Sequence, residues 1–372
     1  MRIVSAQLRD FRSYSRAQAQ LGPGLTVVHG PNGAGKSNLL EALYFGCTAR
    51  SPRTHSDREL VRFGADAVRV VVKTAEGSLE HELSVGFGTL AGGARSAKRM
   101  TADGAQVERL LEIPDRPLLS VFMPDRLELV KGGPTLRRAH LDQFLAALWP
   151  ARAETRRDYS RVLAQRNALL GRIRSGRGSH ATLSTWDREL ADAALALSRL
   201  RAEAVALLRA PFAERATQLG CNGDMTVEYR PRSQALDAEE FVAELEQRLA
   251  SDLERGFSGH GPHRDELAIL RDGRELRVYG SQGEQRLALL ALLLAERAVL
   301  AEQRRRTPVM LLDDVMSELD SERRELLVRE LSLGGQSVIA TTDLAHVPGA
   351  GNAAVARLRV SPGAILQEAL AA

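Results

Sequence analysis

The stretch that decides the fold is GPNGAGKSNLLEA, residues Gly30 to Ala42. It follows an apolar run, Leu25 to Val28, that is typical of a buried strand, and it opens a helical pattern at Asn38. Its glycines, lysine and serine match the spacing G-x-x-x-x-G-K-S/T between a strand and a helix. Backbone N–H groups of such a loop surround phosphates. A glycine-rich turn without a ligand is the alternative, but the pattern favours a nucleoside triphosphate site.

The predicted phosphate contacts run from the first glycine of this loop into the first turn of the helix. Lys36 is expected to reach the terminal phosphates, and the Ser37 hydroxyl is expected to bind Mg²⁺. The nucleotide-binding residues predicted from the motif are Gly30, Pro31, Asn32, Gly33, Ala34, Gly35, Lys36, Ser37 and Asn38.

A second apolar run ends in two carboxylates. Val309 to Leu312 is followed directly by Asp313 and Asp314. A buried strand that presents a carboxylate to Mg²⁺ is a weak pattern alone, but it gains weight after a strong phosphate loop. We predict that Asp313 binds the metal together with Ser37. Asp314 stands where ABC-type ATPases usually carry the glutamate that polarises water, and it is the predicted catalytic residue. Alternatively, Asp314 only caps the turn that follows the strand.

The pentapeptide SQGEQ, Ser281 to Gln285, opens a long apolar helix. It resembles the S-G-G-Q signature of ABC ATPases, with Glu284 at the glutamine position. A helix N-terminus that carries serine and glycine offers free N–H groups and a favourable dipole to an anion. In that architecture the signature binds the γ-phosphate held by a second protomer. Ser281, Gly283 and Glu284 are therefore predicted to act in trans, and an ordinary helix cap is the alternative.

Composition is that of a soluble globular protein, with 44% hydrophobic and 26% charged residues. The longest apolar run, Leu287 to Ala295, is too short to cross a bilayer, and the first residues do not resemble a signal peptide. Cys47 and Cys221 have no metal-ligand spacing and indicate reduced thiols. We expect a cytoplasmic protein without a membrane partner.

The basic charge is almost entirely arginine, since only four of the 51 basic residues are lysines. The formal net charge is +4. Arginine-rich stretches can bind nucleic-acid phosphates, although a charge run is more often a solvated helix face. An aromatic content of 4% argues against an extended stacking platform for single strands. The candidate DNA contacts are Arg50, Arg53, Arg95, Lys98 and Arg99.

Strand and helix patterns divide the chain into three segments. Residues 1–130 mix strands and helices, long helical periodicity begins in residues 131–300, and strand patterns return after Gly256 and continue through residues 301–372. We therefore predict an α/β fold in which one sheet is assembled from both ends of the chain and interrupted by a helical lobe. Within that lobe, one helix is expected to end near Pro211, and residues 267–278 are expected to form a hairpin.

Taken together, the motifs resemble the SMC-like branch of ABC ATPases, and more closely the RecF family of recombination-repair proteins. The resemblance covers nearly the full length. The similar blocks are Phe11 to Ser13, Gly30 to Tyr44, Ala49 to Gly64, RRAHLD (Arg137 to Asp142), Tyr159 to Leu170, GPHRDE (Gly261 to Glu266), Tyr279 to Arg286 and Leu311 to Asp320.

The resemblance implies an ABC/SMC-like ATPase head with ATP and Mg²⁺ as cofactors. Lobe I would comprise residues 1–130 and 301–372, lobe II would comprise residues 131–300, and Arg12 would join the nucleotide-binding residues. The resemblance also implies an ATP-dependent homodimer on gapped or junction DNA. Such a dimer would help RecA loading with RecO and RecR, support SOS induction, and be released by slow, DNA-stimulated hydrolysis.

Two alternatives remain open at this stage. A structural DNA clamp with negligible ATP turnover would use the same motifs. A transporter ATPase would need a Q-loop and a switch histidine, whereas Thr342 or Asp343 occupies the switch position after the strand Ser337 to Ala340. The role of GPHRDE is expected to be a turn that positions the following hairpin.

Overall fold

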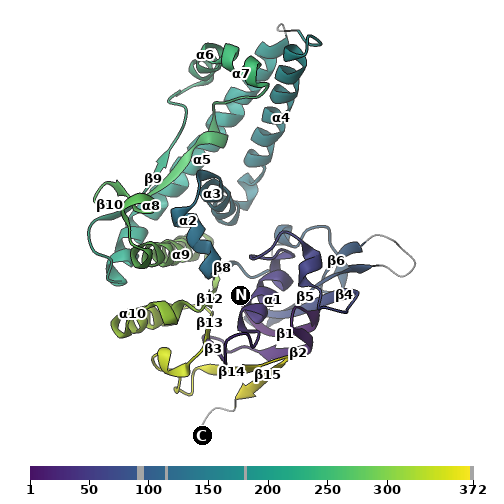
Figure 1. The fold of residues 1–372 in the computed structure, drawn as a ribbon, viewed down its shortest axis with the longest axis vertical. Coiled ribbons are helices and arrows are strands. Elements are labelled where there is room, and N and C mark those ends of the chain that lie inside the picture. The colour runs from purple at the N-terminus through teal and green to yellow at the C-terminus, as the bar shows by residue number, and fades with distance from the viewer. Residues whose placement is uncertain (90–95, 114–115, 180–181, 369–372) are drawn as a thin grey trace. The chain divides into compact units, whose positions relative to one another are not determined.

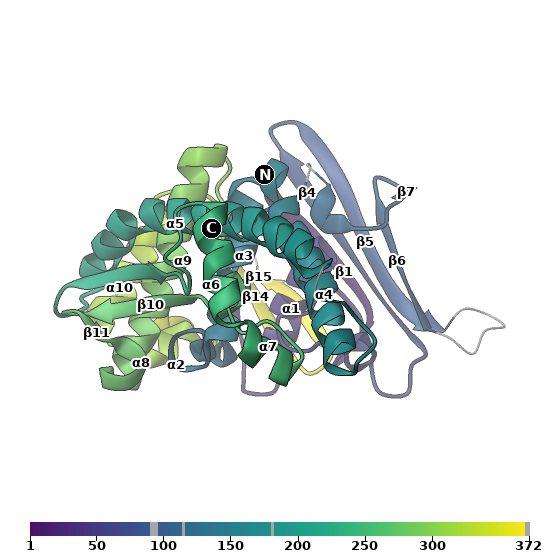
Figure 2. The ribbon, with the colours of Figure 1, turned by 90° about the horizontal axis from the view of Figure 1, so that it is seen from above.

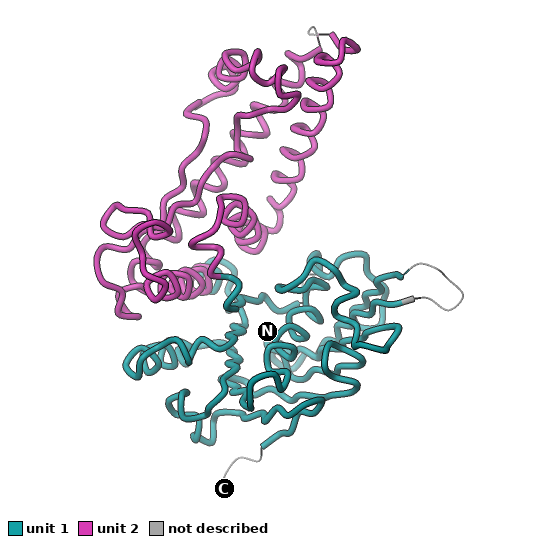
Figure 3. The backbone as a smooth tube through the Cα atoms, in the orientation of Figure 1, with its two compact units in different colours: residues 1–126, 300–372 teal, residues 127–299 magenta. Residues whose placement is uncertain are grey.

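The structure is a computed structural model that describes residues 1–89, 96–113, 116–179 and 182–368. It divides into two compact units, shown in Figure 3. Unit 1 comprises residues 1–126 and 300–372, and unit 2 comprises residues 127–299. Unit 1 is therefore built from both ends of the chain.

A mostly parallel six-stranded sheet forms the centre of unit 1. Strand β3 from the N-terminal part lies between two strands from the C-terminal part and runs parallel to both, as Figure 1 shows. Every residue of β12 and β13 is buried, as expected for strands covered on both faces. The sheet order is β15 (Ala364–Glu368), β14 (Ala356–Ser361), β3 (Leu25–His29), β13 (Ser337–Thr341), β12 (Val309–Asp313) and β8 (Leu119–Phe122).

An antiparallel six-stranded sheet makes the second layer of unit 1. Helix α1 (Lys36–Thr48) contacts strands of both sheets, and its buried Leu39, Leu43 and Phe45 belong to the core that joins them. Helix α10 (Ser321–Ser332) follows β12. Figure 2 shows the antiparallel strands side by side. Their order is β2 (Tyr14–Gln20), β1 (Arg2–Phe11), β4 (Ala67–Glu76), β5 (Leu79–Thr89), β6 (Ser96–Ala102) and β7 (Ala105–Gln106).

One buried side chain ties the two sheets together. The carboxamide of Gln336 accepts a hydrogen bond from the Ile3 N–H and donates to the Ile3 carbonyl, both at 2.7 Å. It also donates to the carbonyl of Gly22 at 2.7 Å. Gln336 is 3% exposed, so these bonds satisfy an amide that would be costly to bury alone. Gln336, which directly precedes β13, thus binds the backbone of the first strand of the chain.

Unit 2 is mainly helical and carries a small antiparallel sheet. Helices α4 and α5 pack against one another, and β9, β10 and β11 form the sheet. Helix α9 begins in unit 2 and ends in unit 1. The elements are α2 (Glu128–Lys131), α3 (Pro134–Leu148), α4 (Glu154–Arg174), α5 (Leu183–Gln218), β9 (Met225–Arg230), α6 (Ala238–Gln247), α7 (Leu249–Arg255), β10 (Glu266–Arg271), β11 (Arg274–Glu275), α8 (Leu276–Tyr279) and α9 (Gln282–Arg304).

Two expectations for unit 2 were wrong in detail. Helix α5 continues through Pro211 to Gln218, because Leu208, Phe212 and Ala216 carry its buried stripe across the proline. Their packing outweighs a proline penalty of about 3 kcal/mol. The expected second strand of the hairpin is only Arg274–Glu275, and α8 follows it.

Sequence blocks that lie far apart meet in a buried polar network in unit 2. The guanidinium of Arg201 pairs with Asp142 at 2.9 Å and with Asp265 at 3.1 Å. Arg137 makes a two-pronged ion pair with Glu266, at 2.7 and 2.8 Å. Buried arginine–carboxylate pairs fix orientation because each unmade bond would be costly. The GPHRDE segment therefore joins helices α3 and α5 to the start of β10.

Candidate nucleotide site

The phosphate loop follows β3, and α1 begins at Lys36. Gly30, Gly33 and Gly35 have φ values of 150°, 76° and 116°, which side chains rarely allow. A Cβ on Gly30 would lie 2.2 Å from the Val360 carbonyl oxygen, and one on Gly35 would lie 2.8 Å from the Tyr14 hydroxyl. Glycine is thus required by the loop's conformation and close packing. The curved loop leads directly into the N-terminal amides of α1, which have no acceptors within the helix.

Lys36 lies over the phosphate loop. Its ammonium group donates to the carbonyl oxygens of Gly30 and Pro31, each at 2.9 Å. Burial lowers the pKa of Lys36, and the nearby carboxylates of Asp314 and Asp313 act against that shift. The side chain is therefore held where a terminal phosphate would replace backbone carbonyls as its partner.

The two predicted metal ligands lie together. Asp313 ends β12, and its carboxylate accepts a hydrogen bond from the Ser37 hydroxyl at the start of α1. Burial raises the pKa of Asp313, while the Ser37 hydrogen bond and the charges of Arg53 and Lys36 oppose the increase. A hydroxyl and a carboxylate beside a phosphate loop are a suitable oxygen set for Mg²⁺. The residues therefore fit the metal that the sequence predicted.

Asp314 occupies a strained backbone position at the same edge of the sheet. Its φ is 52°, a left-handed conformation that aspartate and asparagine tolerate better than most residues. The backbone N–H donates to the Ala340 carbonyl at 3.1 Å. Its Oδ1 atom is buried and has no hydrogen-bond donor among the residues that the structure describes. A buried carboxylate oxygen without a donor is suited to hold a water.

A buried carboxylate organises the basic residues beside α1. Glu41 is fully buried and accepts two hydrogen bonds from Arg12, at 2.8 and 3.0 Å. Arg53 donates to Glu41 at 3.1 Å and to the Asn38 amide oxygen at 3.0 Å. Ser51 also donates to Glu41, at 2.6 Å. The structure thus places both Arg12 and Arg53 against helix α1, the helix that follows the phosphate loop.

The other candidate DNA residues lie in different surroundings. Lys98 pairs with Asp57 at 2.7 Å and donates to the Ala49 carbonyl at 2.8 Å. Arg50 and Arg99 are exposed. Arg95 lies outside the described residues. Of the described candidates, Arg50 and Arg99 therefore present the most accessible charge.

The signature segment forms a capping box at the start of α9. The Ser281 hydroxyl accepts from the Glu284 N–H at 3.3 Å, and the Glu284 carboxylate accepts from the Ser281 N–H at 2.8 Å. That bond lowers the pKa of Glu284, whose carboxylate also pairs with Arg271. A Cβ added to Gly283 would meet no described atom within 4 Å. The fold of a single chain therefore gives no steric reason for glycine at position 283.

Three residues beside the loop were missed from the sequence. Tyr14 donates to the Gly35 carbonyl at 2.9 Å, and Glu41 and Ser51 form the cluster with Arg12. Tyr14 directly follows the block Phe11 to Ser13, which provided the only sequence signal for this contact. Glu41 carried a weaker signal, because an acidic residue in a helix is usually solvated.

Comparisons with known proteins cover nearly the whole chain. Residues 5–115 match the family described as an AAA domain. The chain is 35% identical to the DNA replication and repair protein RecF of Heliobacterium modesticaldum, with 93% of each chain covered. It is 37% identical to RecF of Myxococcus xanthus, covering 94% of this chain and 93% of the relative.

Solved structures show the same fold. The structure of the recombination mediator protein RecF-ATP in the RecFOR pathway has a TM-score of 0.86 and 27% identity, covering 99% of this chain and 98% of that one. An Smc head bound to the C-terminal winged-helix domain of ScpA has a TM-score of 0.59 at 15% identity, covering 100% and 98%, which shows the fold alone.

The two-sheet unit, the phosphate loop and the carboxylates after β12 define a P-loop protein with an SMC-like head. The inserted unit 2 and the capped helix α9 complete this architecture. The chain belongs to the RecF family of DNA replication and repair proteins. Among the described residues, no helix is both long and apolar enough to cross a membrane.

Proposed function

We propose that this chain binds ATP and Mg²⁺ at the phosphate loop, dimerises around the nucleotide and thereby gains affinity for DNA during replication and repair. The observation that carries the proposal is the convergence of Lys36, Ser37 and Asp313 at one end of the parallel sheet. The family relationship over nearly the full length supports it.

Binding would use groups that are already in place. The N–H groups at the start of α1 and the Lys36 ammonium would bind the phosphates, and the glycines would let the backbone approach them. Ser37 and Asp313 would hold Mg²⁺, which neutralises phosphate charge when it is bound. Mg²⁺ usually relies on one or two carboxylates together with phosphate oxygens, and the Ser37–Asp313 pair suits this mode.

Dimerisation would supply the contacts that unit 1 of one copy lacks. Ser281 and Gly283 of a second copy would offer their N–H groups and the positive end of α9 to the terminal phosphate. The open space above Gly283 supports this role, because a phosphate could approach the backbone there. Nucleotide would then favour the dimer by differential affinity for two states.

Asp314 would act as the general base for hydrolysis. Its buried Oδ1 could accept a proton from a water directed at the terminal phosphate. Aspartate is one methylene shorter than the usual glutamate, so water would be held loosely and turnover would be slow. Loss of the terminal phosphate would remove the contact between copies and release the DNA.

In the cell, this cycle would place the protein at gapped or junction DNA in the cytoplasm. RecO and RecR would be its partners in helping RecA replace single-strand-binding protein, and SOS induction would follow. The related structure of the recombination mediator protein RecF-ATP in the RecFOR pathway supports this assignment.

Molecular mass in solution tests the proposal directly. The mass should double with a slowly hydrolysed ATP analogue and Mg²⁺, and return to the monomer value with ADP. Affinity for duplex DNA should rise in the same condition. If neither the molecular mass nor the DNA affinity changed with the bound nucleotide, the proposal would be contradicted.

A structural clamp with negligible turnover is the second candidate, and the short reach of Asp314 favours it. Phosphate release measured with and without gapped DNA distinguishes the two. Turnover stimulated by DNA supports the ATPase cycle, whereas ATP-dependent dimers without phosphate release support the clamp.

A further inference from the structure

A line of arginines crosses the antiparallel sheet of unit 1. Arg16 on β2 pairs directly with Arg9 on β1, and Arg9 pairs with Arg69 on β4. Arg69 pairs with Gly86 on β5, and Gly86 pairs with Arg99 on β6. Directly paired residues point to the same face of a sheet. We call Arg16, Arg9, Arg69 and Arg99 the arginine row.

The arginine row lies on the face away from the core. All four side chains are exposed, and Arg9 is 71% exposed. The neighbouring positions on the same strands pair with one another on the opposite face and pack on the core. These apolar residues are Ala17, Leu8, Val70, Val85 and Met100. Because successive side chains of a strand point to opposite faces of the sheet, the arginine row faces solvent while these apolar neighbours face the core.

Most positions beside the arginine row carry small, polar or aliphatic side chains; the exceptions are Asp10, next to Arg9, and the buried pair Phe11 and Tyr14 at the end of β1. On one side of the row, small residues on β4, β5 and β6 pair with one another: Ala67, Gly88 and Ala97. On the other side, polar or aliphatic residues of five strands pair with one another: Gln18, Gln7, Val71, Ser84 and Thr101. The exposed face is therefore positively charged along one line of the sheet.

The fold neutralises little of this charge. Arg69 donates to the Ser84 hydroxyl at 3.1 Å, which is an uncharged partner. Asp10 lies 4.0 Å from Arg9 but is engaged by Arg62 at 2.8 Å. Within the described ranges, no carboxylate lies within 4.0 Å of Arg16 or Arg99. Like charges in directly paired positions are destabilising, so the row lowers stability unless an anion covers it.

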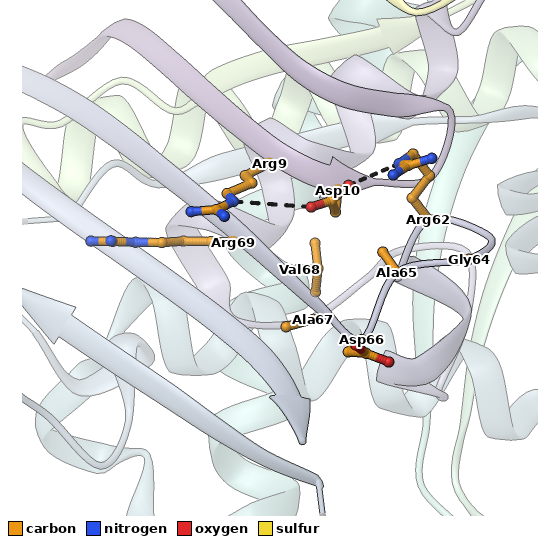
Figure 4. Close-up of a pocket in the computed structure, with 9 residues that line it drawn as sticks. All are labelled: Arg9, Asp10, Arg62, Gly64, Ala65, Asp66, Ala67, Val68 and Arg69. Atoms are coloured by element: carbon orange, nitrogen blue, oxygen red, sulfur yellow. Dashed lines mark hydrogen bonds and ion pairs between the residues drawn. The ribbon is translucent and has the colours of Figure 1, made fainter. Parts of the chain in front are cut away.

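A cavity adjoins one end of the pair Arg9 and Arg69. Its volume is about 440 Å³, and Arg62 and the segment Gly64 to Val68 complete its lining. Figure 4 shows the side chains of Arg9 and Arg69 extending beside one another from neighbouring strands. Asp10 lies between Arg9 and Arg62, and Asp66 also lines the cavity, so three arginines face two carboxylates there.

We propose that the arginine row is the surface on which the phosphate backbone of duplex DNA docks; this inference rests on the proposed function. At a strand spacing of about 4.8 Å, Arg16 and Arg99 are about 19 Å apart, which equals five to six base pairs along a duplex. Guanidinium groups suit phosphate oxygens in geometry and charge. The row lacks stacking side chains, so it recognises the backbone of a duplex and not unstacked bases.

The test compares two variants of equal charge loss. In the first, the four arginines of the row are replaced by glutamine. In the matched control, four exposed arginines elsewhere are replaced in the same way: Arg109, Arg188, Arg329 and Arg359. Both variants should bind ATP as the parent does and melt as cooperatively, because these arginines lie outside the phosphate loop.

Duplex affinity is measured in the ATP state over a series of salt concentrations. The row variant should bind more than about tenfold more weakly at 0.1 M salt, and its salt dependence should flatten by roughly 3 to 4 in log–log slope. The control should remain within about twofold of the parent, because non-contacting charges act only at long range. Two duplexes of equal length and unrelated sequence should give the same result.

Equal duplex binding by the parent and the row variant would overturn the docking surface while leaving the proposed function intact. A parent that binds no duplex in any nucleotide state would overturn both. Retained DNA binding by the row variant, with loss of binding only to anionic phospholipid vesicles, would assign the row to a membrane surface and also overturn the proposal.

Discussion

The Tyr14 hydroxyl donates a hydrogen bond of 2.9 Å to the carbonyl of Gly35, the last residue of the phosphate loop. Tyr14 begins β2, directly after the turn that connects it to β1. In the same turn the Ser13 hydroxyl accepts from the Asn38 amide at 3.0 Å. One hairpin therefore touches the nucleotide loop at its turn and carries Arg9 and Arg16 of the arginine row along its strands.

Tyr14→Phe should weaken nucleotide binding several-fold and lower the free energy of unfolding by about 0.5–1.5 kcal/mol, because the ring still packs and the Gly35 carbonyl loses one of two donors while it keeps the Leu39 N–H. Calorimetry and denaturant unfolding measure the two effects. Tyr159→Phe is the control, since Tyr159 bonds to His263 in unit 2. The control should lose stability but keep parental nucleotide affinity. Equal loss of nucleotide affinity in both variants would argue against the hairpin contact.

Lys36→Ala should lower ATP affinity by about 10- to 150-fold, since a hydrogen bond to a charged group contributes about 1.5–3 kcal/mol. Dimerisation and DNA binding should be lost with it at ordinary ATP concentrations. Lys73→Ala removes an exposed lysine from β4 and serves as the control. Light scattering with the ATP analogue measures the outcome. A Lys36→Ala chain that still dimerised on adding ATP would place the nucleotide elsewhere.

Asp313→Asn should reduce Mg²⁺-dependent nucleotide binding by at least about 10- to 100-fold. In the chain without metal, the same substitution should instead raise the stability of the fold at neutral pH. Burial raises the pKa of Asp313, so the folded state keeps this proton at a pH where the unfolded state has lost it. The parent should therefore gain stability as pH falls through the raised pKa, with the gain complete below the unfolded pKa. Asp313→Asn should melt higher at neutral pH and lack this contribution. A lower melting temperature would contradict this account.

Asp314→Asn should keep ATP binding and the dimer but slow hydrolysis by about 10²–10⁴-fold, because the amide cannot accept the proton from water. Asparagine also tolerates the left-handed backbone at this position, so the fold should survive. Single-turnover phosphate release is the measurement, with DNA residence time as a second readout that should lengthen. Turnover within about twofold of the parent would leave Asp314 as a turn residue only.

Gly283→Ala should move stability and function in opposite directions. Alanine meets open space at this position and should stabilise α9 by up to about 1 kcal/mol, while its methyl group obstructs approach of a second copy's phosphate. Gly171→Ala is the control, because Gly171 lies in α4 and its added Cβ also meets no described atom within 4 Å. The control should dimerise normally. This design avoids Ser281, whose replacement by arginine would also break the helix cap.

Local chemistry explains what could be read from the sequence. The phosphate loop with Lys36, and the strand that ends in Asp313, were predicted from residues a few positions apart in the sequence. Their spacing is typical of a nucleotide-binding loop and of a buried strand that ends in a carboxylate. The α/β fold and the assembly of one sheet from both ends followed from strand patterns near Leu25, Val309 and Ser337. These predictions needed no knowledge of which strands pair.

The remaining features depend on pairing and packing. The arginine row exists only because the register aligns Arg9 with both Arg16 and Arg69, and residue spacing within one strand does not reveal this alignment. The prediction that Arg53 binds DNA rests on its basic neighbourhood, and that neighbourhood did not indicate its contact with the buried Glu41 of α1. Pro211 indicated a helix end, but the buried stripe of α5 continues past it.

The position of β3 between β13 and β14 has a consequence for the order in which the protein is made. The ribosome releases the phosphate loop early, but both flanking strands lie more than 300 residues later in the chain. At about 5–20 residues per second, that interval is roughly 20 s to a minute. During this time β3 has neither of its neighbours, so the ATP site of a nascent chain forms only after β13 and β14 have been made.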